Sequence, residues 1–173
     1  MKPAKRILEK AKNVGATVFV HAENGEILDF LRNECVKKGQ LTPKYHYVSR
    51  PPFIEAEGVR RSAYLAGKAG THLYIAHVTS REAMAEIQEA KGKGINVNGE
   101  SCTHYLTTTK EVLDNPDFNE AAKYVCSPAL RDQEDVDALW DALNSGLLTA
   151  ISSDHCGIDV AELKQAGRDD FTQ

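Results

Sequence analysis

The 173-residue sequence predicts an α/β fold built around a parallel β-sheet. Four short apolar runs, rich in β-branched residues, alternate with stretches that carry apolar residues every three or four positions, as amphipathic helices do. Because helices separate the strands, successive strands should run parallel. Three of the four runs also end on a histidine or an aspartate, which would bring polar groups together at one edge of the sheet.

The first part of the chain contains one expected strand and three expected helices. These are a helix over 3–13, a strand over 16–22, a helix over 24–38 and a helix over 54–70. Gly15 and Gly39 follow the first two helices as stop signals. Between the second and third helices, segment 40–53 holds three prolines and mixed polarity, which predicts a long connection of a kind that is often functional.

The second part continues the alternation. We expect a strand over 72–78, a helix over 80–94, a strand over 95–101, a helix over 132–144 and a strand over 147–154. Ser80 is the expected N-cap of the 80–94 helix. Segment 105–114 should form a short helix or turn, and segment 123–131 an extended piece stopped by Pro128. The polar tail over 160–173 is expected to form a helical turn.

Composition indicates a soluble globular domain. The chain is 42% hydrophobic and 27% charged, with a net charge of -4 and no Lys/Arg run longer than two, which argues against nucleic acid as a partner. No run approaches the ~20 apolar residues of a membrane span, and the charged N-terminus lacks the apolar core of a signal peptide. None of the four cysteines forms a C-x-x-C pair, so we expect free thiols and a cytoplasmic location.

The sequence lacks the characteristic motifs of two common α/β fold classes. The first strand is not followed by G-x-G-x-x-G, and the chain has no Walker A lysine loop, so dinucleotide and P-loop folds are disfavoured. A (β/α) barrel remains, but a closed barrel needs eight strands and typically ~250 residues. The sequence shows four strands.

The strand ends suggest a metal site. His21 ends the first strand, His77 the second and Asp154 the fourth. Functional groups gather at the carboxyl ends of parallel strands, and neutral imidazole and carboxylate are suitable ligands for zinc and similar ions. Taken singly, each residue has a structural alternative, because a strand-end histidine can be part of the core and an aspartate can cap a helix.

Other polar side chains near the strand ends have structural interpretations. Glu23 and Glu26 could form a catalytic acid/base pair, but serving the start of the following helix is the favoured interpretation. His46 could touch substrate, but a solvated loop residue is the favoured interpretation, and His104 is expected to lie outside the site. Glu100, at the end of the third strand, is either a site carboxylate or a structural hydrogen-bonding group.

Seven motifs along the chain resemble one known family. They are, in order, "VHAENGE", "RPPFIEAEGVRR", "LYIAHVTS", "NGESCTHYL", "KYVCSPALR", "SSDHC" and "GRDDFT". Together they resemble the dihydropyrimidinase/D-hydantoinase branch of the amidohydrolase superfamily, over nearly the whole chain. The "HAENG" string favours this branch over the dihydroorotases and allantoinases, which share the superfamily chemistry.

The resemblance implies a fold, a cofactor and a reaction. The family fold is a (β/α)₈ barrel with two divalent ions, usually Zn²⁺, and full-length members form homo-oligomers. By resemblance, His21 and His77 bind the more exposed metal, Asp154 binds the other and shuttles the proton, and the Ser127 backbone contacts the cyclic imide or ureide substrate. The implied activity is that of a cyclic-amide hydrolase, which opens dihydropyrimidine or hydantoin rings through a metal-bridged hydroxide, as in pyrimidine degradation.

The chain also departs from the family pattern. It has no H-x-H pair, and no lysine stands where the family carries its bridging carboxylated lysine. The resemblance therefore implies a fragment: residues 1–173 as one partial amidohydrolase domain, about strands 5–8 of the barrel, inactive alone. Two alternatives stay open, a non-enzymatic interaction or assembly module and a complementing half-barrel.

Overall fold

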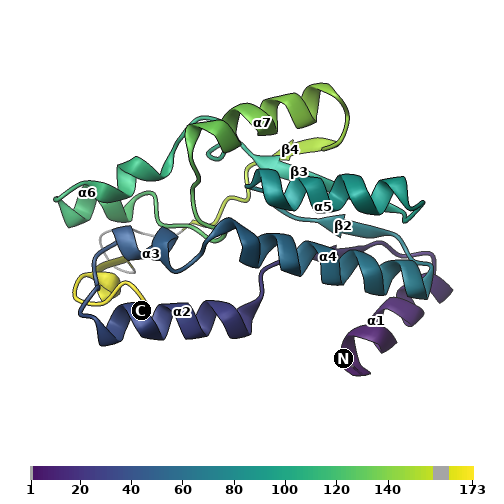
Figure 1. Ribbon diagram of the computed structural model, residues 1–173, viewed down its shortest axis with the longest axis horizontal. Helices are drawn as coiled ribbons and strands as arrows, with labels where there is room; N and C mark the ends of the chain where they lie inside the picture. Colours follow the sequence, from purple (N-terminus) through teal and green to yellow (C-terminus); the bar gives the residue numbers. More distant parts are fainter. Residues whose placement is uncertain (1, 158–163) are drawn as a thin grey trace.

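A four-stranded parallel sheet organises the molecule (Figure 1). The computed structural model describes residues 2–157 and 164–173. The strands are hydrogen-bonded in the order β1-β2-β3-β4, and each neighbouring pair is parallel. They span β1 Val18–Val20, β2 Leu73–Ile75, β3 Val97–Cys102 and β4 Ala150–Ser152. The predicted α/β fold with a parallel sheet is confirmed.

Helices connect the strands, largely where the sequence pattern predicts them. They are α1 Lys2–Asn13, α2 Gly25–Lys37, α3 Lys44–Val48, α4 Pro52–Ala69, α5 Arg81–Gly92, η1 Lys110–Asp114, α6 Phe118–Ala122, α7 Gln133–Asn144 and η2 Lys164–Gly167. Ser80 caps α5 as predicted, its hydroxyl accepting from the Ala83 amide at 3.2 Å. In the tail, η2 agrees with the expected helical turn, and 160–163 lie outside the described residues.

Two short helices were not predicted. Segment 40–53, expected to be a loop, contains α3, and α6 precedes the segment expected to be extended. Each helix has five residues, too few for an apolar period of 3.6 to show. Segment 123–131 forms turns and irregular backbone rather than a strand.

The core lies between one face of the sheet and the helices α4 and α5. Leu73 and Ile75 of β2 pack with Val59 of α4 and Ile87 of α5, and all four are at most 1% exposed. The apolar residues that recur every three or four positions in the helices, and every second position in the strands, therefore pack into one layer. This packing explains the spacing of apolar residues in the sequence.

The opposite face of the sheet is more open. Phe19 of β1 is 63% exposed and stacks on Tyr74 of β2, with ring centroids 5.3 Å apart. Glu100 of β3 accepts hydrogen bonds from the Tyr74 hydroxyl at 3.0 Å and the Ser152 hydroxyl at 2.9 Å. Of the two interpretations of Glu100, the structural one agrees with these contacts.

The carboxyl ends of the strands share one side of the molecule. In Figure 1 this is the left side of the sheet, where α2, α3 and α6 lie. The segments that follow β1, β2 and β4 carry the predicted site residues to this side. No helix in the ranges 2–157 and 164–173 is long and apolar enough to cross a membrane.

Candidate functional site

His21 and His77 meet at the carboxyl end of the sheet. His21 directly follows β1 and His77 lies two residues after β2. His21 Nδ1 and His77 Nε2 are 3.0 Å apart, and the rings meet edge to face. Two nitrogens bound to one tetrahedral zinc ion at ~2.0–2.1 Å would lie about 3.3 Å apart. The spacing of the pair is therefore close to that of two nitrogens on one divalent ion.

The two histidines differ in their surroundings. His77 is buried, whereas the side chain of His21 is 47% exposed. Burial and the nearby His21 lower the pKa of His77, and the charge of Asp154 opposes that shift. A neutral imidazole is the form that binds metal, so the environment of His77 favours ligation.

Asp154 lies near this pair but is not hydrogen-bonded into it. It follows β4 by two residues and is exposed. Burial lowers the pKa values of His77 and His104, and the charge of Asp154 is close enough to oppose both shifts. The described residues contain no group of three or more His, Cys, Asp or Glu side chains arranged to hold a metal ion. The structure therefore brings two of the three predicted ligands into contact and places the third nearby.

His77 and Asp154 share an unusual backbone conformation. Their φ angles are +35° and +43°, and they are the non-glycine residues with positive φ in the described part of the chain. This left-handed region costs free energy for residues with a side chain, and such strain clusters at functional sites. Among the described non-glycine residues, the strained positions are therefore two of the three predicted metal ligands.

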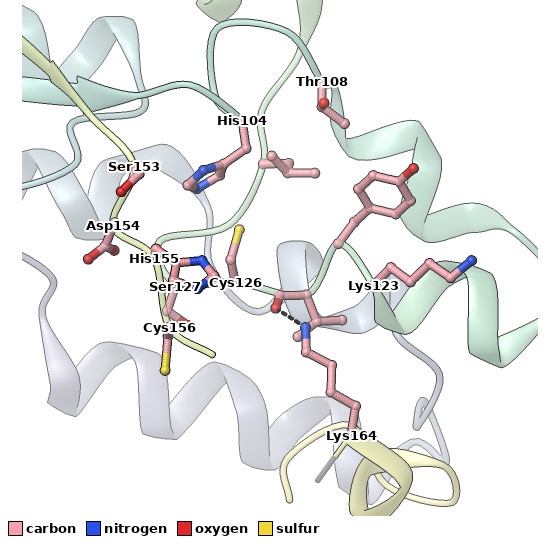
Figure 2. Close-up of a pocket in the computed structure, with 13 residues that line it drawn as sticks. His104, Thr108, Lys123, Cys126, Ser127, Ser153, Asp154, His155, Cys156 and Lys164 are labelled. Carbon is pink, nitrogen blue, oxygen red and sulfur yellow. Dashed lines mark hydrogen bonds between the residues drawn. The ribbon is translucent and has the colours of Figure 1, made fainter. Parts of the chain in front are cut away.

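A cavity of about 460 Å³ adjoins Asp154. Figure 2 shows His104, Cys126 and His155 turned toward a common space, with Asp154 at its edge and Lys164 at its far side. The Lys164 ammonium donates to the backbone carbonyls of Ala122 and Val125, at 2.7 and 2.6 Å. His104, which was predicted to lie outside the site, therefore lines the pocket beside Asp154.

Ser127 also lines the pocket, and a buried histidine supports its segment. Ser127 is exposed, and the preceding Cys126 carbonyl accepts a hydrogen bond from His46 Nε2 at 2.7 Å. Arg50 in turn donates to His46 Nδ1 at 3.2 Å. The expectation of a solvated His46 was wrong: the residue is 5% exposed, because α3 folds it under the Ser127 segment.

The environment keeps His46 uncharged. Burial, followed by the charge of Arg50, lowers the pKa of His46 to about 3. Since Arg50 can only donate, His46 Nδ1 is the acceptor and Nε2–H is the donor to Cys126. His46 is therefore a fixed neutral donor to the chain that carries Ser127.

A buried ion pair joins the loops around the site. Glu55 of α4 and Arg131 are 2% and 5% exposed in their side chains and lie 3.2 Å apart. Glu55 accepts from the Thr79 amide at 2.8 Å and hydroxyl at 2.6 Å, and Arg131 donates to the Thr79 hydroxyl at 2.9 Å and to the Arg50 carbonyl. This network ties the turn after His77 to the end of the Ser127 segment.

Comparisons with known proteins identify relatives of this chain. A scan against protein-family models found no match. A D-hydantoinase from Ralstonia pickettii is 46% identical over 166 residues, which is 96% of this chain and 36% of that protein. A dihydropyrimidinase from Arabidopsis thaliana is 39% identical over 164 residues, 95% of this chain and 31% of that protein. The crystal structure of dihydropyrimidinase from Brevibacillus agri matches with a TM-score of 0.95 and 44% identity, over 98% of this chain and 36% of that one.

Over nearly its whole length, the chain is homologous to proteins named D-hydantoinase and dihydropyrimidinase. It spans about a third of the length of the relatives it matches. The resemblance inferred from the seven motifs is confirmed by both the sequence and the structural comparisons.

The sequence analysis of this hydantoinase homologue missed two features, the contact of Glu23 with His21 and the burial of His46. Glu23 does not serve the start of α2 as predicted: its Oε2 lies 2.9 Å from His21 Nε2, and Asn24 is the N-cap. Glu26 does lie in the first turn of α2. The spacing of two residues between His21 and Glu23 could have indicated their contact. The burial of His46 depends on a segment 80 residues away, so no local sequence pattern indicates it.

Proposed function

We propose that the chain forms part of a metal-dependent cyclic-amide hydrolase of the dihydropyrimidinase/hydantoinase type. The observation that carries the proposal is the 3.0 Å approach of His21 Nδ1 and His77 Nε2 at the carboxyl end of a parallel sheet. Two imidazoles at this spacing, with a carboxylate nearby, are a donor set suited to zinc. The substrate class is a small cyclic ureide or imide, such as a dihydropyrimidine or a hydantoin.

Within this proposal, residues 1–173 make one partial barrel domain corresponding to about strands 5–8. His21 and His77 would hold one divalent ion, and Asp154 would contribute to a second. The 173 residues contain no His-x-His pair, so the remaining ligands would come from sequence outside them. The chain by itself is then expected to be inactive.

The chain's own residues have distinct roles in ring opening. Divalent ions, when bound, would supply Lewis-acid activation of water and of the amide carbonyl. Asp154 would accept the proton of the attacking water and return it to the leaving ring nitrogen. The Ser127 backbone would hold the ring, and the His46 hydrogen bond to Cys126 would keep that backbone in place.

A chimeric enzyme tests the proposal. The matched stretch of the Ralstonia pickettii D-hydantoinase would be replaced by this chain, which is 46% identical to it over 166 residues. We expect the chimera to hydrolyse hydantoin, and Asp154→Asn to lower kcat by about 10²–10⁴-fold, the range of a general acid–base group.

The matched control is Asp141→Asn, on the exposed side of α7. It should leave kcat unchanged. A folded chimera without turnover, or one in which the Asp154 and Asp141 variants are equally active, would contradict the proposal. The alternative of a non-enzymatic interaction module receives no support from the compared relatives, since these relatives are named as enzymes.

A further inference from the structure

We infer that Glu23 is a positioning residue that fixes the tautomer and orientation of His21, so that Nδ1 is the metal-binding nitrogen. The inference rests on the proposed function, whose ion His21 would hold. Glu23 Oε2 lies 2.9 Å from His21 Nε2, while His21 Nδ1 lies 3.0 Å from His77 Nε2. The His21 ring thus bridges a carboxylate on one side and the second ligand on the other.

Hydrogen-bond chemistry determines the tautomer. An ionised carboxylate can only accept, so His21 Nε2 must carry the proton. In the neutral His21 ring, Nδ1 then holds the lone pair and accepts the hydrogen of His77 Nε2–H across their 3.0 Å contact. A carboxylate behind a metal-binding histidine fixes the ring and raises its basicity, and removal of such a group typically lowers metal affinity 10–100-fold.

A helix-capping role does not account for Glu23. The α2 N-cap is Asn24, whose side chain accepts from the Ile27 amide at 3.1 Å, and Glu26 supplies the negative charge of the first turn. The Glu23 side chain is only 5% exposed, and its Oε1 is buried with no hydrogen-bond partner. Burying a carboxylate with one oxygen unpaired costs stability.

Arg50 and helix α4 lie close to the turn that carries Glu23. Glu23 lies close enough to oppose, through its charge, the lowering of the Arg50 pKa that burial causes. The turn between His21 and Glu23 also packs directly on α4: a Cβ at Gly58 would lie 2.7 Å from the Ala22 carbonyl. Packing against α4 therefore fixes the backbone from which the Glu23 side chain reaches the His21 imidazole.

The first test reads the tautomer in the metal-free 173-residue chain. Long-range ¹H–¹⁵N correlation spectra at neutral pH distinguish the two imidazole tautomers, and His21→Gln assigns the resonance. The wild type should show His21 in the Nε2–H form. Glu23→Leu, which removes the acceptor, should give a mixture, and Glu23→Gln, which keeps an amide oxygen, an intermediate result.

The second test is zinc affinity by chelator competition on the same variants. Glu23→Leu should bind zinc 10–100-fold more weakly than the wild type, with Glu23→Gln between them. Glu26→Leu and Glu26→Gln are matched controls, since Glu26 lies three residues along the chain, is exposed and contacts neither histidine. Both should behave as wild type in tautomer and in affinity.

The inference is overturned if His21 keeps the Nε2–H form in Glu23→Leu to the same extent as in Glu26→Leu. A Glu23 variant that unfolds at a lower temperature without any change in tautomer would likewise assign Glu23 a purely structural role. Failure of the proposed function is a separate outcome, because it would leave the chimera without turnover while the metal-free tautomer result still stood.

Discussion

At the scale of single residues, the two most informative positions are the strained turns at His77 and Asp154. Their positive φ angles are maintained against the preference of ordinary L-residues. Burial of His77 and exposure of Asp154 give the two side chains different environments at the same edge of the sheet. The strain is a property of the backbone that the sequence alone did not reveal, because histidine and aspartate occur at strand ends without it.

The strain at Asp154 predicts that glycine at this position gives a more stable protein than alanine, the reverse of their usual order in a helix. At φ +43°, alanine costs about 1–2 kcal/mol that glycine avoids. Asp154→Gly should therefore be about 1 kcal/mol more stable than Asp154→Ala in urea unfolding. In helix α7, Asp141→Gly should instead be about 1 kcal/mol less stable than Asp141→Ala. The same ranking at both positions would contradict the strained turn.

His46 predicts a loss of stability on acidification. Its folded pKa of about 3 lies below the unfolded value of about 6.5, so the unfolded chain binds more protons between these values. The charges of Arg50, Lys164 and Arg131 all act in this direction. Stability is therefore lost as the pH falls below about 6.5, and this group should contribute about 2 kcal/mol of loss between pH 7 and pH 5.

Urea unfolding at the two pH values measures this loss. His46→Gln should reduce the pH difference by about 2 kcal/mol. His155→Gln changes an exposed histidine near the pocket and serves as the control. An unchanged pH difference in His46→Gln would show that the buried histidine is not held neutral.

At the scale of elements, the position of α4 determines the geometry of the first strand end. Gly58 lets α4 approach the backbone of Ala22 and Glu23, and Glu55, one turn earlier, binds the turn that follows His77. One helix therefore supports both strand ends that carry the paired histidines. In α4, Gly58 allows the close approach and Glu55 supplies the hydrogen bonds, while other residues of the helix pack in the core.

Gly58→Ala tests the close approach. The added Cβ would lie 2.7 Å from backbone atoms that cannot rotate away, so we expect a loss of about 2 kcal/mol in free energy of unfolding. Gly92→Ala, at the end of α5 with open space around it, should be neutral or stabilising by up to about 1 kcal/mol. Equal effects in the two variants would mean that α4 does not press on the turn.

The elements also show which features a sequence can predict. The long helices and the four strands were predictable because their apolar periods match the layer that they bury, and Ser80 was predictable as a cap from local chemistry. The observed strands are shorter than the apolar runs, so His21, His77 and Asp154 follow the strands rather than end them. The burial of His46 and the Glu55–Arg131 pair depend on tertiary contacts, which no local pattern encodes.

At the scale of the whole molecule, the chain presents a parallel sheet with β1 and β4 at its edges and helices packed mainly on one face. The exposed Phe19 on the other face and the coverage of about a third of each relative agree with the proposal that this domain is part of a larger barrel. In that setting, the paired histidines would complete their ligand set with groups from outside the 173 residues.

The most direct test of the central claim is the zinc content of the chimera described above, by elemental analysis, for the unmodified protein and His77→Gln. The account predicts a loss of about one zinc ion per chain in His77→Gln. His72→Gln is the control, because His72 bonds to Thr17 and Asn98 and lies before β2, and it should keep the full zinc content. Equal zinc content in His77→Gln and the unmodified chimera would contradict the assignment of the histidine pair as a metal centre.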